Sequence, residues 1–451
     1  MWRAAHRLIN ALNHIAGSER YSCEAKDIMG VAHSIYRLIT DAKAPNQQAA
    51  DRVATHVTAL TGTKLADGLI DPKLVLAWLL NAIGAPGYLI GVLVPVRESG
   101  SLLPQLALAQ RIEQSRQRKY YWAAGSGLQG LAALGIATAA LLLPGVAAGW
   151  VILACLALLA VARSACSASY KDILARTVDK GKRGSVSGTA GTLAASGVFL
   201  FAVLLSTGLL PRTTVAISLV VALAGVFWLG SAAIFARLDE PEAAPQEAEG
   251  FAPNQLLRPL KEDYELRRYI GTRALLVSTA LAPPFLVMLG GRDAESGFGN
   301  LGLLVLTSSI AAIVSSYIWG KLSDRSSRQT LMISGALSAM TLAAAAAVGW
   351  TAGAPAGIVV AGFVFVAQIA YQGARAGRKT HLTDMDTDGH TSVYTALSNT
   401  LIGVLILLGG GFGLLADAFG AAPVLALLAI LSGLGAALGA RLSEVQDESA
   451  N

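Results

Sequence analysis

Residues 316–331 read Ser-Tyr-Ile-Trp-Gly-Lys-Leu-Ser-Asp-Arg-Ser-Ser-Arg-Gln-Thr-Leu and join two long apolar stretches. The nine residues from Gly320 to Arg328 place a glycine, one acid and three bases in a single short loop. Gly320 has no side chain, so it allows two helices to turn closely at a membrane face. Asp324 can pair with Arg325 or Arg328, or face the positive N-terminus of a neighbouring helix. Such a latch would hold one conformation and release in another, although the bases also serve simply as membrane anchors.

The composition is that of a membrane protein. Of the 451 residues, 54% are hydrophobic and only 14% are charged, whereas a soluble domain usually carries about 25% charged residues. The apolar residues form runs near the roughly 20 residues that a helix needs to cross a bilayer. These runs are rich in Leu, Ala, Gly and Val and do not alternate, which favours helices over a membrane barrel. The twelve predicted spans cover 74–95, 99–112, 121–143, 147–168, 186–207, 213–236, 271–290, 299–319, 329–349, 355–374, 394–416 and 420–440.

Lys and Arg are distributed unevenly over the predicted loops. Fifteen of them lie in the loops after spans 2, 4, 8 and 10, against three in the odd-numbered loops. Short cytoplasmic loops carry the excess of positive charge in membrane proteins. The even-numbered loops and both termini are therefore predicted to face the cytoplasm. The net charge of +6 is a topology signal on this interpretation and gives no reason to expect a nucleic-acid partner.

The loop and the layout together resemble the major facilitator superfamily of transporters. Gly320–Arg328 is similar to the loop signature of that family, and an acidic, Pro- and Ala-rich linker at 238–256 divides six predicted spans from six. Ala162–Leu174 also aligns without gaps on Ala370–Leu382, after spans 4 and 10. The resemblance implies an all-α integral membrane protein whose twelve transmembrane helices form two six-helix pseudo-repeats, with a substrate site between them. It also implies a permease of a bacterial-type inner membrane that works by alternating access.

The first part of the chain lies outside the predicted transporter unit. Residues 1–72 are expected to form an amphipathic, helical extension on the cytoplasmic side, with one of its helices at about 46–66. The remaining predicted units are six spans in 73–237, a cytoplasmic acidic linker in 238–270, six spans in 271–441 and a cytoplasmic tail in 442–451.

Three charged residues within or beside predicted spans are candidates for function. Arg97 and Glu98 border the short second span, where charges face either an interface or a water-filled cavity. In a cavity, Glu98 is a proton-coupling carboxylate and Arg97 is its partner or an anion contact; in an outer loop, both are solvated. Arg163 lies inside the fourth span, where it either acts in transport or extends its side chain to the membrane surface. Further polar candidates for the substrate or proton pathway, which otherwise make helix–helix hydrogen bonds, are Asn81, Gln105, Gln368, Tyr371, Gln372 and Asn399.

The sequence predicts neither an enzyme, nor a cofactor, nor a metal site. It contains no phosphate-binding loop and no arrangement of nucleophile and base or of metal ligands. The segment Asp384–Gly389 begins like a calcium-binding loop, but Thr395 takes the twelfth position, where a glutamate is needed. The expected partners are a small-molecule solute and possible co-transported protons, in a protein that is a monomer in the lipid bilayer.

Two functions remain open at this point. The first is secondary active transport of a small solute, for which the few charges in the spans favour a neutral, amphipathic or anionic molecule over a polycation. The second is a transporter-fold sensor or partner protein that no longer moves solute. The second gains support from the loop at Leu108–Arg118, which stands where the first half should repeat the Gly320–Arg328 signature but lacks its glycine and aspartate in register.

Overall fold

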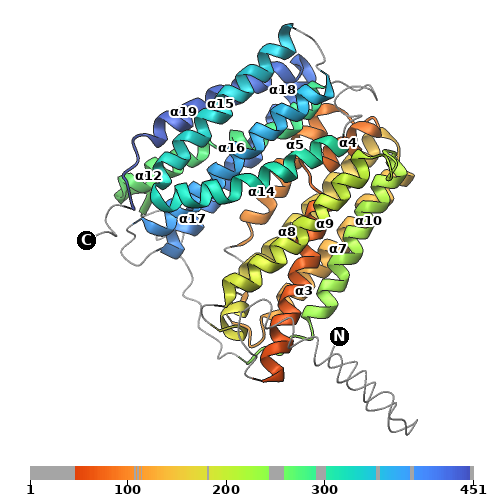
Figure 1. The fold of residues 1–451 in the computed structure, drawn as a ribbon, viewed down its shortest axis with the longest axis vertical. Coiled ribbons are helices and arrows are strands. Elements are labelled where there is room, and N and C mark those ends of the chain that lie inside the picture. Colours follow the sequence, from red (N-terminus) through yellow and green to blue (C-terminus); the bar gives the residue numbers. More distant parts are fainter. Residues whose placement is uncertain are drawn as a thin grey trace.

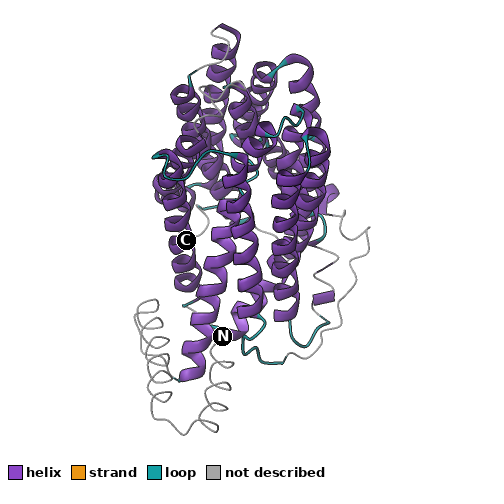
Figure 2. Ribbon diagram, turned by 90° about the vertical axis from the view of Figure 1, so that its right-hand side faces the viewer, coloured by secondary structure: helices purple, strands orange, loops and turns teal. Residues whose placement is uncertain are grey.

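The computed structural model describes residues 46–242, 259–290, 301–351, 356–385 and 391–446, with short gaps at 106–107, 109–110, 113 and 180–181. In these ranges every regular element is a helix. The helices form two groups that lie side by side, which we name the N half and the C half (Figure 1). Most of the long helices run in roughly the same direction along the molecule (Figure 2).

The N half contains seven helices among the described residues. They are α3 (Gln47–Leu69), α4 (Val75–Ala82), α5 (Gly87–Leu102), α7 (Lys119–Leu142), α8 (Gly145–Thr177), α9 (Arg183–Ser206) and α10 (Thr214–Phe235).

The C half contains eight helices among the described residues. They are α12 (Tyr264–Leu275), α13 (Ser278–Leu289), α14 (Leu301–Arg325), α15 (Ser327–Thr351), α16 (Gly357–Asp384), α17 (Thr391–Leu408), α18 (Gly411–Phe419) and α19 (Ala421–Gly439).

The outer surface of both halves is apolar. Large side chains on the outside of the bundle include Leu131, Leu158, Leu219 and Ile430, each about half exposed. Within the described residues, nine helices are long and apolar enough to cross a membrane, and the bent α14 would be a tenth. Helices satisfy their own backbone hydrogen bonds, so such a surface suits contact with lipid. The protein is therefore a multi-pass membrane protein, as predicted.

Helix α3 lies inside the N half, although the sequence placed it in a separate extension. It packs between α9 and α10, and Ala59 and Ala66 on it are fully buried. The prediction of a helix at 46–66 is confirmed, but the boundary at residue 72 is wrong for α3. Its four Asp, Lys and Arg side chains lower the hydropathy of the segment, and this hid its place in the bundle. Residues 1–45 lie outside the described part of the chain.

The limits of three predicted spans are also corrected. The first predicted span, 74–95, is divided by a turn at Gly84, whose φ of 77° suits a residue without a side chain. Helix α5 then runs unbroken through the predicted loop at 96–98. In the C half, α12 and α13 together make one candidate span, Tyr264–Leu289. That span takes in the end of the stretch 238–270, which the sequence assigned to a linker.

Candidate solute site between the two halves

Helix α5 forms the central contact between the halves. At its start, the backbone N–H of Gly87 donates a 2.9 Å hydrogen bond to Asp417 Oδ1 at the end of α18. One turn further, a Cβ added to Gly91 would lie only 2.4 Å from the Cα of Gly413. Near its other end, Ser99 Oγ donates a 2.7 Å hydrogen bond to the carbonyl of Gly403 on α17. Glycine on both sides lets the backbones approach this closely.

Three charged side chains from three helices of the N half meet beside this contact. Arg97 Nη2 on α5 lies 2.6 Å from Asp67 Oδ1 on α3. Arg163 on α8 pairs with the second oxygen of the same carboxylate. We name Asp67, Arg97 and Arg163 the N-half charge cluster. The arrangement ties α3, α5 and α8 together and shows that Arg97 pairs with Asp67 rather than with Glu98.

Glu98 faces the other half. It lines a pocket at the interface together with Arg273, Tyr371, Arg375 and Arg378 of the C half. The same pocket is lined by apolar side chains from the α12–α13 junction and from α13, α15, α16 and α17. Among the described residues no cation lies within 4.0 Å of the Glu98 carboxylate, since no ion pair includes it. Arg97 and Glu98 are adjacent on α5 but lie in different surroundings. Arg97 lies inside the N half and Glu98 lies at the interface.

A lysine from the N half also reaches the C half. Lys73 lies in the break between α3 and α4, where its backbone N–H donates a 2.8 Å hydrogen bond to Asp71 Oδ1. Its Nζ stands 3.4 Å from the centroid of the Tyr371 ring on α16. The lysine is 9% exposed, so this cation–π contact is largely desolvated and worth about 2 kcal/mol. Lys73 also interacts electrostatically with Glu98.

On the far side of the pocket, Arg273 of α12 is buried with neutral partners. Its Nη1 donates a 2.7 Å hydrogen bond to Ser398 Oγ and its Nη2 a 2.8 Å hydrogen bond to Asn399 Oδ1. Its Nε has no hydrogen-bond partner among the described residues. Arg273, Arg375 and Arg378 form what we name the C-half arginine cluster. No carboxylate of the described residues forms an ion pair with any of the three.

The structure brings together five of the residues that the sequence proposed for the pathway: Arg97, Glu98, Arg163, Tyr371 and Asn399.

The other four proposed residues lie elsewhere. Gln105, just beyond the end of α5, donates its side-chain hydrogen bond to the carbonyl of Ser101 in that helix. Gln372 lines a second, wider pocket between α3, α9, α14 and α16. Asn81, at the end of α4, and Gln368, on α16, are half-buried and line neither of these two pockets.

Five charged residues of the site were missed in the sequence: Asp67, Lys73, Arg273, Arg375 and Arg378. Asp67 belongs to α3, which was assigned to a separate extension, and Arg273 lies inside the predicted span 271–290 but was not among the proposed residues. Arg375 and Arg378 were read as anchors of a loop. A signal was available for these two, because Tyr371, Arg375 and Arg378 follow the spacing of one helix face.

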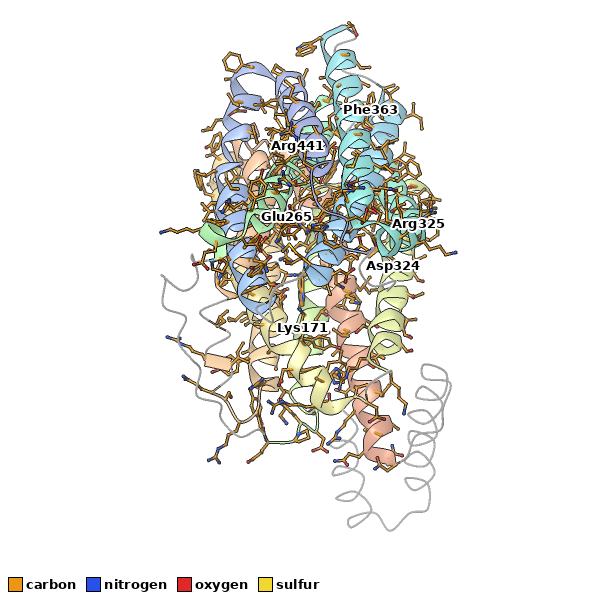
Figure 3. All side chains as sticks on the ribbon, turned by 90° about the vertical axis from the view of Figure 1, so that its left-hand side faces the viewer. Lys171, Glu265, Asp324, Arg325, Phe363 and Arg441 are labelled. Atoms are coloured by element: carbon orange, nitrogen blue, oxygen red, sulfur yellow. The ribbon has the colours of Figure 1, made fainter. Side chains whose placement is uncertain are left out.

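The stretch Gly320–Arg328, which the sequence predicted as a loop, covers the end of α14 and the start of α15, with only Ser326 between the two helices. Asp324 and Arg325 are exposed at the end of α14 (Figure 3), and no ion pair among the described residues joins Asp324 to Arg325 or Arg328. A Cβ at Gly320 would meet nothing within 4 Å, so the expected close approach is absent there.

A different contact holds this loop. Arg328 Nε lies 3.4 Å from Glu444 Oε2, beyond the end of α19. Ser326 Oγ donates a 2.5 Å hydrogen bond to the same oxygen. The segment after α19 therefore fastens the α14–α15 loop.

The sequence matches no protein-family model and no curated protein. Solved structures share its fold at low sequence identity. A mutant of the nucleoside transporter NupG superposes with a TM-score of 0.68 at 12% identity, over 87% of this chain and 100% of that one. A POT family transporter with a bound thioalcohol-conjugated peptide gives 0.65 at 9% identity, over 85% and 94%. A mutant of the peptide transporter POT gives 0.64 at 12%, over 86% and 93%.

These neighbours are transporters and not enzymes, and they have the fold of the major facilitator superfamily. The chain therefore has that fold, as the Gly320–Arg328 loop and the layout of apolar runs predicted.

Proposed function

We propose that this protein is a secondary active transporter that moves a small solute by alternating access. On this proposal α3 with α4, α12 with α13, and α17 with α18 are broken spans, and the other nine helices cross the membrane singly, which gives twelve crossings in two halves. The excess of Lys and Arg in the even-numbered loops supports a cytoplasmic location for both termini.

One observation carries the proposal. Charged residues are concentrated where the two halves meet, in a bundle whose outer surface is apolar. Ionisable side chains within a membrane bundle are costly and mark substrate or ion pathways. The breaks in α3–α4 and α12–α13 lie beside this site, and discontinuous helices are a common feature of substrate sites in transporters.

Glu98 is the residue we propose for proton coupling. Asp67 is already neutralised by two guanidinium groups in the N-half charge cluster. Glu98 has no direct ion pair among the described residues and lines the interface pocket. The protonation of Glu98 therefore depends on what else the pocket holds. A residue that couples proton movement to solute movement requires this dependence. A proton on Glu98 would change the balance of charge at the surface where the halves move apart.

Uptake into proteoliposomes tests the proposal. Structural neighbours transport nucleosides and peptides, so the panel consists of labelled nucleosides, dipeptides, small carboxylates and small phosphates, with and without a pH gradient. We expect accumulation of at least one solute. We expect Glu98→Gln to abolish gradient-driven uptake and retain exchange. Normal driven uptake by this variant would overturn the coupling role, and ligand-induced conformational change without any uptake would favour the sensor function.

A further inference from the structure

The interface pocket contains more positive charge than negative charge. Its lining includes three arginines and a single carboxylate, that of Glu98. Glu98 also interacts electrostatically with Lys73 and Asp71, whose opposite charges offset each other. Its weaker partner Arg97 is already paired with Asp67. The pocket is therefore cationic even when Glu98 is ionised.

The buried member of the C-half arginine cluster makes this imbalance costly. Arg273 is 7% exposed and its hydrogen-bond acceptors, Ser398 and Asn399, are neutral. A buried charge without a counter-charge destabilises a protein by several kcal/mol. Its Nε, which lacks a partner among the described residues, offers one more donor at the edge of the pocket.

Helix α16 supplies the other two arginines in a geometry suited to a ligand. Arg375 and Arg378 lie one turn apart and line the same pocket as Arg273. Arg375 is exposed and Arg378 is half-buried. The three guanidinium groups thus extend from a buried residue to an exposed one, around a cavity of about 20 Å³ in this conformation. Guanidinium groups bind carboxylate and phosphate through paired, charge-assisted hydrogen bonds.

We infer that the interface pocket binds the carboxylate or phosphate group of its solute through the C-half arginine cluster. Glu98 partly neutralises these arginines when it is ionised, and its negative charge then repels the solute anion. This inference rests on the proposed transport function, which gives the site access from both sides of the membrane. It names the substrate class as anionic. It also joins anion binding to protonation, because a neutral Glu98 no longer repels the anion.

Thermal unfolding of the purified full chain in detergent tests the inference directly. The probes are succinate and glycerol 3-phosphate, each compared at constant ionic strength with a neutral analogue, succinamide or glycerol. A ligand that binds only the folded state raises the melting temperature by mass action. We expect the two anions to raise it and the neutral analogues to leave it unchanged.

Three variants and a matched control separate a binding role from a structural one. Arg378→Gln should weaken anion affinity roughly tenfold or more, and Arg378→Lys should recover part of it. Lys379→Gln is the matched control, since Lys379 is the next residue of α16, exposed and outside the pocket lining. Glu98→Gln should change affinity in the opposite direction and tighten anion binding several-fold. A purely structural role does not predict opposite signs.

The outcomes are distinct. The inference is overturned if no anion protects, if neutral analogues protect equally, or if Arg378→Gln and Lys379→Gln behave alike. Protection by short-chain phosphatidylglycerol but not by the soluble anions would keep the site and assign its anion to a lipid. Anion binding without uptake would keep the inference and overturn transport. Uptake of neutral solutes without anion binding would do the reverse.

Discussion

The two charged regions of this protein are balanced in different ways. In the N-half charge cluster, one aspartate contacts two arginines directly, and the three side chains join three helices. In the C-half arginine cluster, no carboxylate among the described residues forms an ion pair with any of the three bases. Charge paired within the bundle holds helices together, whereas charge without a partner at an interface is available to a ligand. Helix α5 borders both regions, because Arg97 belongs to the first and Glu98 lines the pocket of the second.

The largest effect is expected from breaking the paired cluster. Asp67→Asn leaves Arg97, which is 9% exposed at its side chain, without a counter-charge. Removing one partner of a buried ion pair costs about 3–5 kcal/mol, so the free energy of unfolding should fall by about that much. Denaturant unfolding in detergent measures it.

The control for this test is an ion pair nearer the surface. The pair Arg52–Asp239 is 20% and 30% exposed at its side chains, so Arg52→Gln should cost about 1 kcal/mol or less. Equal losses for Asp67→Asn and Arg52→Gln would show that the N-half charge cluster is not a structural tie.

The next largest effect is expected at the close approach of α5 and α18, where the two halves meet. A side chain at Gly91 would collide with the backbone of Gly413, so Gly91→Val must push α5 away from α18. Overpacking of this kind costs about 1–3 kcal/mol, and uptake should fall strongly because the halves can no longer close at this end. Gly411→Ala on α18 is the matched control, as a Cβ there meets nothing within 4 Å. Full transport by Gly91→Val would show that this close approach is dispensable.

A smaller effect is expected from a paired charge within the C half. Glu444→Gln removes the carboxylate that pairs with Arg328 and accepts a hydrogen bond from Ser326 Oγ. The expected loss of stability is about 1 kcal/mol, since Arg328 is 35% exposed at its side chain. Asp324→Asn should leave the melting temperature unchanged because Asp324 is exposed and forms no ion pair with Arg325 or Arg328. A larger loss for Asp324→Asn than for Glu444→Gln would restore the latch that the sequence suggested.

The smallest effect on stability is the most informative about the comparison. Arg273→Gln removes a buried charge that has only neutral partners and retains the ability to donate to Ser398 or Asn399. We expect the unfolding free energy of the ligand-free protein to stay the same or to rise, while anion affinity falls. A loss as large as that of Asp67→Asn would show that Arg273 is a structural residue like Arg97.

Much of the fold was readable from the sequence because a bilayer imposes simple rules. Long apolar runs predicted helices, and the Gly320–Arg328 loop predicted the transporter fold that the neighbouring structures show. Helix α3 and the first part of α12 were not predicted as parts of the bundle, since a hydropathy pattern treats a charged segment as soluble whether or not its charges are paired. The ion pair between Arg328 and Glu444 was not predicted, because the segment after α19 is distant in sequence from Arg328.

The sequence by itself therefore determined that the protein lies in a lipid bilayer and that it is a bundle of helices. The composition of a whole apolar helix decides whether it lies in lipid or in water. Five of the nine proposed pathway residues also lie at the site, since polar residues in apolar runs are rare enough to be noticed. Only the tertiary structure decided which charges neutralise one another. Asp67, Arg97 and Arg163 are separated by tens of residues, and ion pairing depends on distances of a few ångströms. It was this pairing that left the arginines of the C half without a carboxylate partner.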